Sequence, residues 1–532
     1  MSFSTVYALG DSLSDSGAFF KATQTLSGIG IPLEALGYAG RFSDGPVFVE
    51  VAADLLGAAL APDLPATLGG LTPFDPFDGL DPGFAYGSAR ATGERTVEDI
   101  LTEAAATAPE LAPLLALLPD EALGFDVSLG GQVERLQATL AAAPPPPGSL
   151  ATIFIGLNDF QTLDASDPFA ALFEGPALVV EILAETEAAA RAAAAGGVET
   201  IALFTYPPAS FLPPIPGAPP PDPLAEALLD GLFALHELGL TALTLELRSE
   251  GVDARLVDYG AMAAAVDADP GGFGLATLDV VSVLGTGGLD GLPNPASFGF
   301  DPDSLGFFDL VHPSAALHGV FGAFTARTLQ ADQTLFLGDP SPPLLFGGRE
   351  QLIVGAGDVD VVFLGGGGDA AFGGAAEDFL YGGSGADLLA GGGAGDALFG
   401  GSFGDLLAGG EGDDTMRGLK GDDVLIVGPG ADDARGGRDD DVFVLDLFAS
   451  SNGSVLRGGR GFDTLFVLNA GNAGGAGLAS ELAEADVEAS GFERIVGLSG
   501  GALPANATES ALLREAAAWN LIDLEAQILT VS

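Results

Sequence analysis

The stretch "GGSGADLLAGGGAGDALFGGSFGDLLAGGEGDDTMR", residues 382–417, repeats a nine-residue unit four times. Each unit opens on Gly-Gly, has aspartate at its sixth position and has an apolar residue two positions later. The first and last units match the pattern G-G-x-G-x-D-x-U-x in full, where U is a large apolar residue. A period this regular indicates a stacked repeat architecture rather than an ordinary globular domain.

The same phase extends well beyond the quoted stretch. Aspartate returns at every ninth position ten times, and the out-of-phase unit "GGRGFDTLF" (458–466) adds one more. The aspartates are Asp360, Asp369, Asp378, Asp387, Asp396, Asp405, Asp414, Asp423, Asp432, Asp441 and Asp463. A disordered Gly-Asp-rich linker is the alternative, but a linker has no physical reason to keep phase over so many units.

Glycine adopts left-handed turns without a side-chain penalty, so each unit supplies a turn and a short strand. The apolar residue then points inward, and a two-sided coil stacks residues that lie two units apart. Stacked carboxylates repel unless a cation lies between them, and Ca²⁺ accepts six to eight oxygen ligands in tolerant geometry. Ten aspartates paired in this way give about eight calcium sites. Without calcium, we expect the segment to be largely unfolded.

This segment resembles the calcium-binding β-roll of RTX proteins over residues 346–466. The resemblance implies structural Ca²⁺ held by the aspartates named above. It also implies export by type I secretion machinery that reads an uncleaved C-terminal signal, here within 467–532, and hence a secreted, extracellular protein. The first residues show no basic leader followed by an apolar core, so we expect no Sec-type signal peptide.

Composition limits the classes of partner. The 532 residues carry a formal net charge of −56 and no cysteine, so disulfides and thiolate metal sites are excluded. Such a charge repels nucleic-acid phosphates and anionic lipid head groups and attracts divalent cations. No uninterrupted apolar run reaches the roughly 18 residues of a membrane span, so we expect no transmembrane segment.

Residues 1–335 have a different pattern. Short apolar runs at 3–10, 151–159, 199–207 and 254–260 alternate with helical patterns such as 176–197 and 223–251. Strands separated by helices of this length predict an α/β domain, a parallel sheet with helices on both faces. We therefore expect this domain over 1–335, a linker at 336–345 and an all-β parallel roll after it.

The run "YALGDSLSDSG" (7–17) places Ser12 just after the first predicted strand. A serine nucleophile needs a base, an acid that orients the base and donors for the oxyanion. In "FFDLVHPS", Asp309 precedes His312 by three residues. His236 lies in an amphipathic helix pattern that favours a surface or core role, and His318 is expected on the helix after His312, packed near the site. Taken alone, Ser12 is also explained as a helix N-cap.

Two further segments offer oxyanion donors. "GFAYGSA" (83–89) contains Gly87, and "IFIGLND" (153–159) places Asn158 just past an apolar strand, where parallel sheets carry their sites. An Asx-turn at a strand end is the alternative for Asn158.

These four blocks, in this order, resemble the GDSL lipase/esterase family, also called SGNH hydrolases, with its flavodoxin-like sheet. The resemblance covers about 1–335 and implies Ser12 as nucleophile, His312 as general base and Asp309 as its orienting acid. It implies an oxyanion hole made by the Ser12 amide, the Gly87 amide and the Asn158 side chain, with no cofactor for catalysis. The expected partner is an ester or lipid substrate. A phospholipase, a polysaccharide acetylesterase and a non-catalytic RTX surface protein stay open as alternatives.

Overall fold

The computed structural model describes most of the chain. The described residues are 2–11, 13–14, 46–61, 89–107, 123–160, 162–163, 172–211, 223–273, 275, 313–337, 342–355, 357–447, 453–470, 476–499, 502–503 and 510–524. The chain divides into two compact units. Unit 1 holds residues 1–260, 279–326 and 528–532, and unit 2 holds 261–278 and 327–527. The domain limits expected from the sequence stay predictions.

Unit 1 is built on a five-stranded parallel sheet with the order β2-β1-β3-β4-β5. Its strands are β1 (Thr5–Gly10), β2 (Ala59–Leu60), β3 (Ser149–Phe154), β4 (Thr200–Phe204) and β5 (Asp253–Val257). Every residue of β3 and β4 is buried, as expected for parallel strands covered on both faces. The predicted α/β sheet is confirmed.

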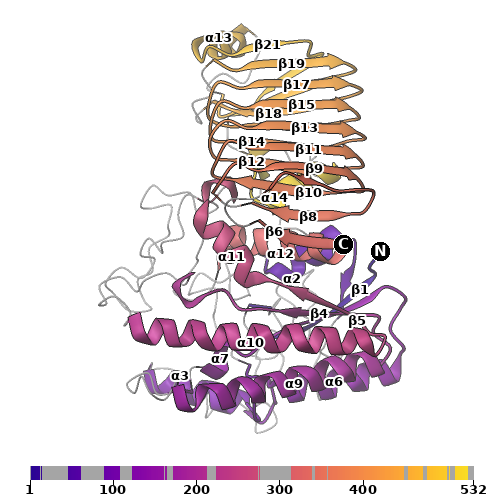
Figure 1. Cartoon of the computed structure of the whole chain (residues 1–532), viewed down its shortest axis with the longest axis vertical. Helices are drawn as coiled ribbons and strands as arrows, with labels where there is room; N and C mark the ends of the chain where they lie inside the picture. The colour runs from indigo at the N-terminus through magenta and orange to yellow at the C-terminus, as the bar shows by residue number, and fades with distance from the viewer. Residues whose placement is uncertain are drawn as a thin grey trace. The chain divides into compact units, whose positions relative to one another are not determined.

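Helices follow or connect these strands. They are α2 (Phe48–Leu56), α3 (Val97–Thr107), α6 (Leu129–Ala142), α7 (Leu157–Phe160), α9 (Gly175–Ala195), η3 (Ala209–Phe211), α10 (Pro223–Ser249), α11 (Tyr259–Ala268), η4 (Gly271–Phe273) and α12 (Ala315–Gln330). The short 3-10 helix η4, which precedes α12, belongs to unit 2. Figure 1 shows α6, α9 and α10 on one side of the sheet and α2 and α12 on the other. The helix α11 begins in unit 1 and continues in unit 2, and α12 likewise crosses the division.

Close approach fixes how α9 and α10 pack. A Cβ at Gly239 of α10 would clash with the side chain of Leu183 of α9, so glycine is needed there. At the end of both helices, Arg191 of α9 donates to Glu246 of α10 at 2.6 Å and also pairs with Glu250.

One described helix, α10, is long and apolar enough by length and composition alone to cross a membrane. It contacts α9, β4 and β5, and the side chains that it buries include Phe233, His236, Leu240 and Leu247. These side chains pack in unit 1, whereas Leu238 and Leu245 of the same helix are exposed.

Unit 2 is a coil of short parallel strands that alternate between two sheets (Figure 1). The nine-stranded sheet holds β6 (Gln333–Phe336), β8 (Gln351–Val354), β10 (Ala370–Gly374), β12 (Leu388–Gly392), β14 (Leu406–Gly410), β16 (Val424–Val427), β18 (Val442–Asp446), β20 (Thr464–Leu468) and β22 (Arg494–Gly497). The eight-stranded sheet holds β7 (Leu344–Leu345), β9 (Val361–Gly366), β11 (Phe379–Ser384), β13 (Ala397–Ser402), β15 (Thr415–Lys420), β17 (Asp433–Arg438), β19 (Val455–Arg460) and β21 (Glu488–Ser490).

The register of the coil follows the repeat. Leu380 pairs with Leu398 in one sheet and Leu389 pairs with Leu407 in the other, two units along in each case. These side chains belong to the apolar core between the sheets and are fully buried. The all-parallel roll with inward apolar residues is confirmed.

The out-of-phase unit at 458–466 also joins the stack. Ala434 pairs with Leu456, a step of 22 residues where the earlier turns, such as that from Leu380 to Leu398, use 18. The four extra residues fall between β18 and β19, so the strand register is kept although the sequence phase is broken.

The last part of unit 2 holds α13 (Ala476–Glu484), α14 (Ala511–Ala518) and a two-stranded parallel sheet of β23 (Ala502–Leu503) and β24 (Asp523–Leu524). Trp519 is fully buried, with its ring 4.4 Å from that of Phe372 on β10. Because it is the only tryptophan of the chain, its fluorescence reports on unit 2 alone.

Candidate functional site

The end of β1 is held by two buried hydrogen bonds between the Gly10 backbone and the Gln132 side chain. The Gly10 amide donates to Gln132 Oε1 at 2.9 Å, and Gln132 Nε2 donates back to the Gly10 carbonyl at 2.8 Å. A Cβ at position 10 would clash with the Phe154 carbonyl and the Ser14 side chain, so the Gly of the G-D-S motif is required by space. The Ser14 amide then donates to the Asp11 carbonyl at 3.0 Å. Ser12 itself lies outside the described residues.

The neighbouring strand β3 ends beside β1, because Gly10 and Phe154 are register partners. After β3 the chain turns at Gly156, which has a φ of +115°. Glycine adopts this backbone angle readily, whereas a residue with a side chain would be strained. Tyr206, at the end of β4, donates its buried hydroxyl to the Ile155 carbonyl at 2.6 Å. This contact fixes the turn that leads to Asn158.

Asn158 and Asp159 attach this turn to the segment that follows the glycine block. Asn158 Nδ2 donates to the Ala89 carbonyl at 3.0 Å. Asp159 is fully buried and accepts hydrogen bonds from the amides of Ala91 and Thr92 at 2.8 and 2.9 Å. The Thr92 hydroxyl adds a third bond at 2.6 Å, and burial raises the pKa of Asp159 despite these donors. These bonds join the "IFIGLND" block (153–159) to the end of the "GFAYGSA" block (83–89) and the residues after it. Gly87 itself lies outside the described residues.

The segment after the D-x-x-H block reaches the same edge of the sheet. Asp309 and His312 lie outside the described residues, and α12 begins shortly after them, with Ser314 Oγ accepting from the Leu317 amide at 3.2 Å. In the first turns of α12, buried His318 accepts the Phe48 amide at 3.2 Å through Nδ1. The Phe48 ring in turn lies 5.8 Å from the ring of Phe154 at the end of β3.

The two described histidines have packing roles. His318 accepts the first amide of α2, as just described. His236 is buried and stacked on Tyr206 with ring centroids 4.2 Å apart, and burial lowers its pKa to about 3. A ring with that pKa is neutral at physiological pH and has no access to a substrate. His312 lies outside the described residues, so its role stays a prediction.

Three residues hold the segments around the candidate site together but are not singled out by the sequence analysis: Gln132, Tyr206 and Asp159. Only Asp159 had a signal, since it stands next to Asn158 in a motif that had already been singled out.

The aspartates of unit 2 form regular ladders. All eleven are buried, with at most 4% of any of them exposed. From Asp369 to Asp441, and again at Asp463, each Oδ1 accepts the amide of the residue one turn of the coil earlier; from Asp360 N to Asp378 Oδ1, for example, the distance is 2.6 Å.

The second oxygen of most of these carboxylates has no hydrogen-bond donor. Oδ2 is buried without a partner among the described residues at Asp369, Asp378, Asp387, Asp396, Asp405, Asp414, Asp423, Asp441 and Asp463. Such an atom is costly to bury unless a cation or proton compensates it. Burial accordingly raises the pKa of Asp387 to about 7 and that of Asp405 to about 9.

A glycine lies beside each of these free oxygens except that of Asp369. A Cβ at Gly382 would lie 2.8 Å from the Gly400 carbonyl and closer still to Asp387 Oδ2. Gly391 stands in the same relation to Asp396 and the Gly409 carbonyl. Carboxylate and carbonyl oxygens therefore converge where a side chain is excluded, which is the donor chemistry that Ca²⁺ prefers.

No group of three or more His, Cys, Asp or Glu side chains able to hold a metal occurs in the described part of the chain. Any calcium in the ladders would thus be held by one or two aspartates together with backbone carbonyls. The residues present fit calcium in that way.

Comparison with protein families agrees with both sets of residues. The model of the GDSL-like lipase/acylhydrolase family matches residues 6–323. The chain belongs to this family. The model of the RTX calcium-binding nonapeptide repeat matches 363–398, 372–407 and 408–443. No curated protein compared with the chain matches it.

Membership in the GDSL-like lipase/acylhydrolase family makes unit 1 the hydrolase part of an ester-hydrolysing enzyme. The RTX repeats make the aspartate ladders a calcium-binding structure. The sequence resemblance to both families is confirmed.

Proposed function

We propose that the protein is a secreted serine esterase or lipase of the GDSL type, with Ser12 as nucleophile, His312 as general base and Asp309 as the acid that orients it. The observation that carries this proposal is the meeting of three distant chain segments at one sheet edge. Gly10 pairs with Phe154, and Phe154 contacts Phe48, whose amide binds His318 of α12. The nucleophile block, the Asn158 turn and the helix after the D-x-x-H block are thereby held together.

In the proposed reaction, His312 takes the Ser12 proton as the hydroxyl attacks the ester carbonyl. The Ser12 and Gly87 amides and the Asn158 side chain stabilise the negative oxygen of the tetrahedral intermediate. His312 then protonates the leaving alcohol, which departs from an acyl-enzyme on Ser12. Water hydrolyses the acyl-enzyme by the same steps in reverse order and releases the acid.

The roll is proposed to act after export. Low calcium inside the cell keeps unit 2 unfolded for the type I machinery, and higher calcium outside folds it. Calcium is structural in this proposal and takes no part in ester hydrolysis. The match to the RTX calcium-binding repeat supports it.

The experiment compares wild type, Ser12→Ala and Ser14→Ala in hydrolysis of a short p-nitrophenyl ester. Ser14 is a matched control because it lies in the same turn and its buried hydroxyl has no hydrogen-bond partner among the described residues. We expect Ser12→Ala to abolish hydrolysis, with an unchanged far-UV spectrum, and Ser14→Ala to retain it. Substantial activity in Ser12→Ala refutes the assignment, and inactivity of the wild type on every ester favours the non-catalytic alternative.

The substrate is a separate question. A chain-length series of p-nitrophenyl esters, run beside phosphatidylcholine and acetylated xylan, separates the esterase, phospholipase and polysaccharide acetylesterase proposals. The substrate with the highest kcat/KM, lost in Ser12→Ala, decides among them.

A further inference from the structure

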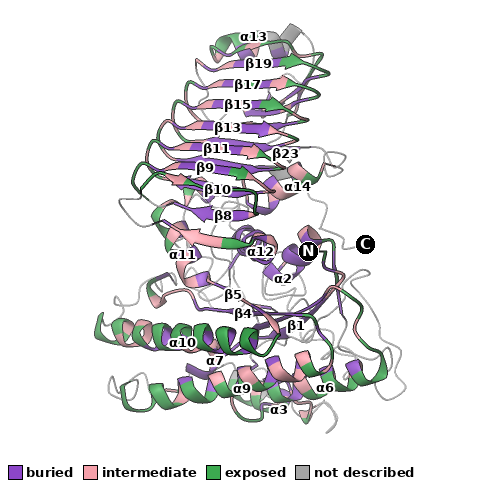
Figure 2. Cartoon of the chain, turned by 45° about the vertical axis from the view of Figure 1, so that its right-hand side comes forward, coloured by how far each residue is buried: buried purple, intermediate pink, exposed green. Residues whose placement is uncertain are grey.

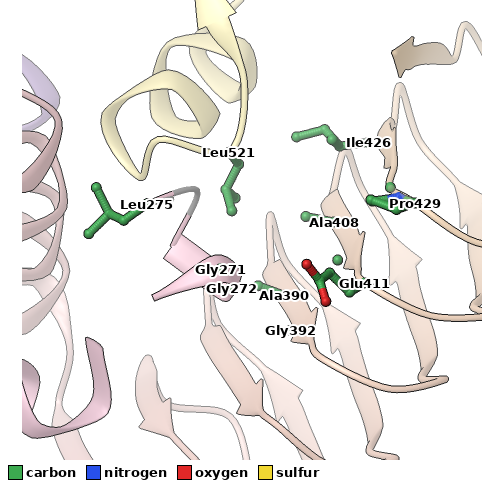
Figure 3. A pocket seen from close by; sticks show the side chains of 12 residues that line it. Gly271, Gly272, Leu275, Ala390, Gly392, Ala408, Glu411, Ile426, Pro429 and Leu521 are labelled. Atoms are coloured by element: carbon green, nitrogen blue, oxygen red, sulfur yellow. The ribbon is translucent and has the colours of Figure 1, made fainter. Parts of the chain in front are cut away.

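The two sheets of unit 2 differ on their outer faces. On the nine-stranded sheet, Phe372 is covered by Trp519 and by Phe273, whose ring lies 5.5 Å away. Beside this cover is a pocket of about 330 Å³ lined mainly by small and apolar residues, with Glu411 as its charged side chain (Figure 3). On the eight-stranded sheet, buried residues alternate with partly or fully exposed ones along β9 to β19 (Figure 2).

One set of outward residues on the eight-stranded sheet forms a column that is one residue wide. Register pairing places Phe363, Tyr381, Phe399, Arg417, Arg435 and Arg457 side by side on successive strands. Neighbouring strands are about 4.8 Å apart, so the column presents an evenly spaced row of three aromatic rings and then three guanidinium groups. We name this row the aromatic-arginine column.

The aromatic part of the column is a platform rather than a set of protruding side chains. Tyr381 and Phe399 are partly exposed, and Phe363 is 36% exposed. Their rings contact one another and Phe379, with centroids 5.2 to 6.4 Å apart. A half-buried ring that its neighbours hold in place offers a rigid flat surface for stacking.

The arginine part surrounds a single carboxylate. Arg417, Arg435 and Arg457 pair with Asp433 at 2.7, 3.0 and 3.0 Å. Three cations on one anion leave a local excess of two positive charges. Asp433 holds the guanidinium groups in position without neutralising them.

Three more cations stand three residues further along the same strands. Lys420, Arg438 and Arg460 are register partners and all exposed. None of them pairs with a carboxylate in the described part of the chain, although the chain has 74 acidic and only 18 basic residues. Like charges at adjacent positions of a sheet are destabilising. We call these three residues the cation ladder.

Other strands of the same sheet have serine at the register position of the cation ladder. On the preceding strands, Ser402 and Ser384 occupy the same register position as Lys420. Serine is thus compatible with the coil at this position, and the fold does not require a cation there. A row of cations that form no ion pair with a described carboxylate and that the fold does not require indicates a role in binding an anion.

We propose that the outer face of the eight-stranded sheet binds a linear acidic polysaccharide. Sugar rings would stack on the aromatic residues of the column, and carboxylates would pair with the arginines and the cation ladder. A linear polymer with repeating rings and charges matches a rigid row with repeating rings and charges. This proposal stands on unit 2 and does not rest on the proposed hydrolase function.

The same features fit two other anions less well. A fluid lipid surface does not require side chains in register. The aromatic residues of the column are held against one another and are at most 36% exposed, which leaves little ring surface to insert into a membrane. A nucleic acid carries a charge on every nucleotide and is repelled more strongly by a chain of −56 than a sparsely charged glycan. Screening over about 8 Å at physiological salt limits that repulsion for a sparsely charged ligand bound directly on the cations.

The test uses the full chain in calcium and isothermal titration with a decamer of galacturonic acid. The ladder variant is Lys420→Ser, Arg438→Ser and Arg460→Ser, which copies Ser384 and Ser402. Its control is Arg349→Ser, Arg494→Ser and Arg514→Ser, which removes the same charge from three exposed arginines that belong to neither row. A further variant, Tyr381→Ser, tests the platform. Trp519 emission shows that each variant is folded.

We expect the wild type and the control to bind equally, and the ladder variant and Tyr381→Ser to bind at least tenfold more weakly. The carboxyl-reduced decamer should not bind measurably. Equal binding by the ladder variant and the control overturns the proposal, as does an absence of binding by folded wild type. Stronger binding to phosphatidylglycerol vesicles or to a dT20 oligonucleotide, lost in the ladder variant, also overturns it and assigns the face to that anion.

Discussion

A single methyl group at Gly391 tests how the aspartate ladders hold calcium. The new Cβ would lie 2.5 Å from the Gly409 carbonyl and closer still to Asp396 Oδ2, the two oxygens that we expect to bind the ion. At Gly393, two residues later, the nearest atom to a new Cβ is 3.6 Å away, an ordinary contact. Neither glycine has a positive φ, so the two substitutions differ in the space around them and not in backbone strain.

The expected cost of Gly391→Ala has two parts. Overpacking a filled site costs about 1 to 3 kcal/mol. Loss of one calcium site removes about 2.7 kcal/mol if the ion is present at 100 times its Kd. Together the two parts lower the free energy of unfolding by about 4 kcal/mol. About seven remaining ions bind as the roll folds, so each must compensate about 0.6 kcal/mol, and the calcium concentration at the midpoint of folding rises about two- to threefold. Gly393→Ala should leave the midpoint within about 1.3-fold, since an unstrained Gly-to-Ala change is worth less than about 1 kcal/mol.

The assay is a calcium titration of the full chain followed by Trp519 emission and by far-UV circular dichroism. Calorimetric titration of the same proteins should find fewer ions bound to Gly391→Ala than to Gly393→Ala. If the two variants have the same midpoint and the same stoichiometry, the space beside Asp396 Oδ2 is not a calcium site and the reasoning is wrong.

Three further predictions concern pH and the site frame. Burial raises the pKa of Asp396 to about 8 and that of Asp405 to about 9 from an ordinary 3.8, so the metal-free roll is most stable below pH 4 and loses stability as the pH rises through 8 and 9. In chelator, acidification from pH 9 to pH 5 should therefore increase β-structure by circular dichroism, and a decrease would contradict the assignment of these pKa shifts. Tyr206→Phe removes the bond to the Ile155 carbonyl, worth about 1 kcal/mol, and should lower kcat about fivefold with KM unchanged, whereas an equal rise in KM would point to a substrate contact instead. Asp159→Asn leaves buried amides of the 91–92 segment poorly paired and should lower kcat at least tenfold in a folded protein, and full activity of this variant would show that the segment needs no such anchor.

Much of the architecture could be predicted because the sequence pattern is local. The nine-residue period sets which residues point inward, and stacking then follows from two units per turn, as Leu380 and Leu398 illustrate. The step of 22 residues at Leu456 could not be predicted, because a four-residue insertion breaks the sequence phase while the strand register is kept.

The frame of the candidate site was less accessible from sequence. Gln132 binds Gly10 from 122 positions away, and nothing in the sequence around Gln132 marks it as a partner of the G-D-S motif. Tyr206 and Asp159 act through backbone groups of other segments, which sequence motifs do not encode. The assignment of Ser12, Gly87, Asp309 and His312 remains a prediction from the family motif, supported by the described residues around it.

Covalent labelling of the nucleophile tests the central claim most directly. The full chain is treated with a fluorophosphonate in calcium, and the modified residue is located by peptide mass spectrometry. We predict one phosphonyl group per chain, on Ser12, with loss of ester hydrolysis in proportion to labelling. Stoichiometric labelling of another residue, or ester hydrolysis that persists while Ser12 is fully modified, would contradict the account.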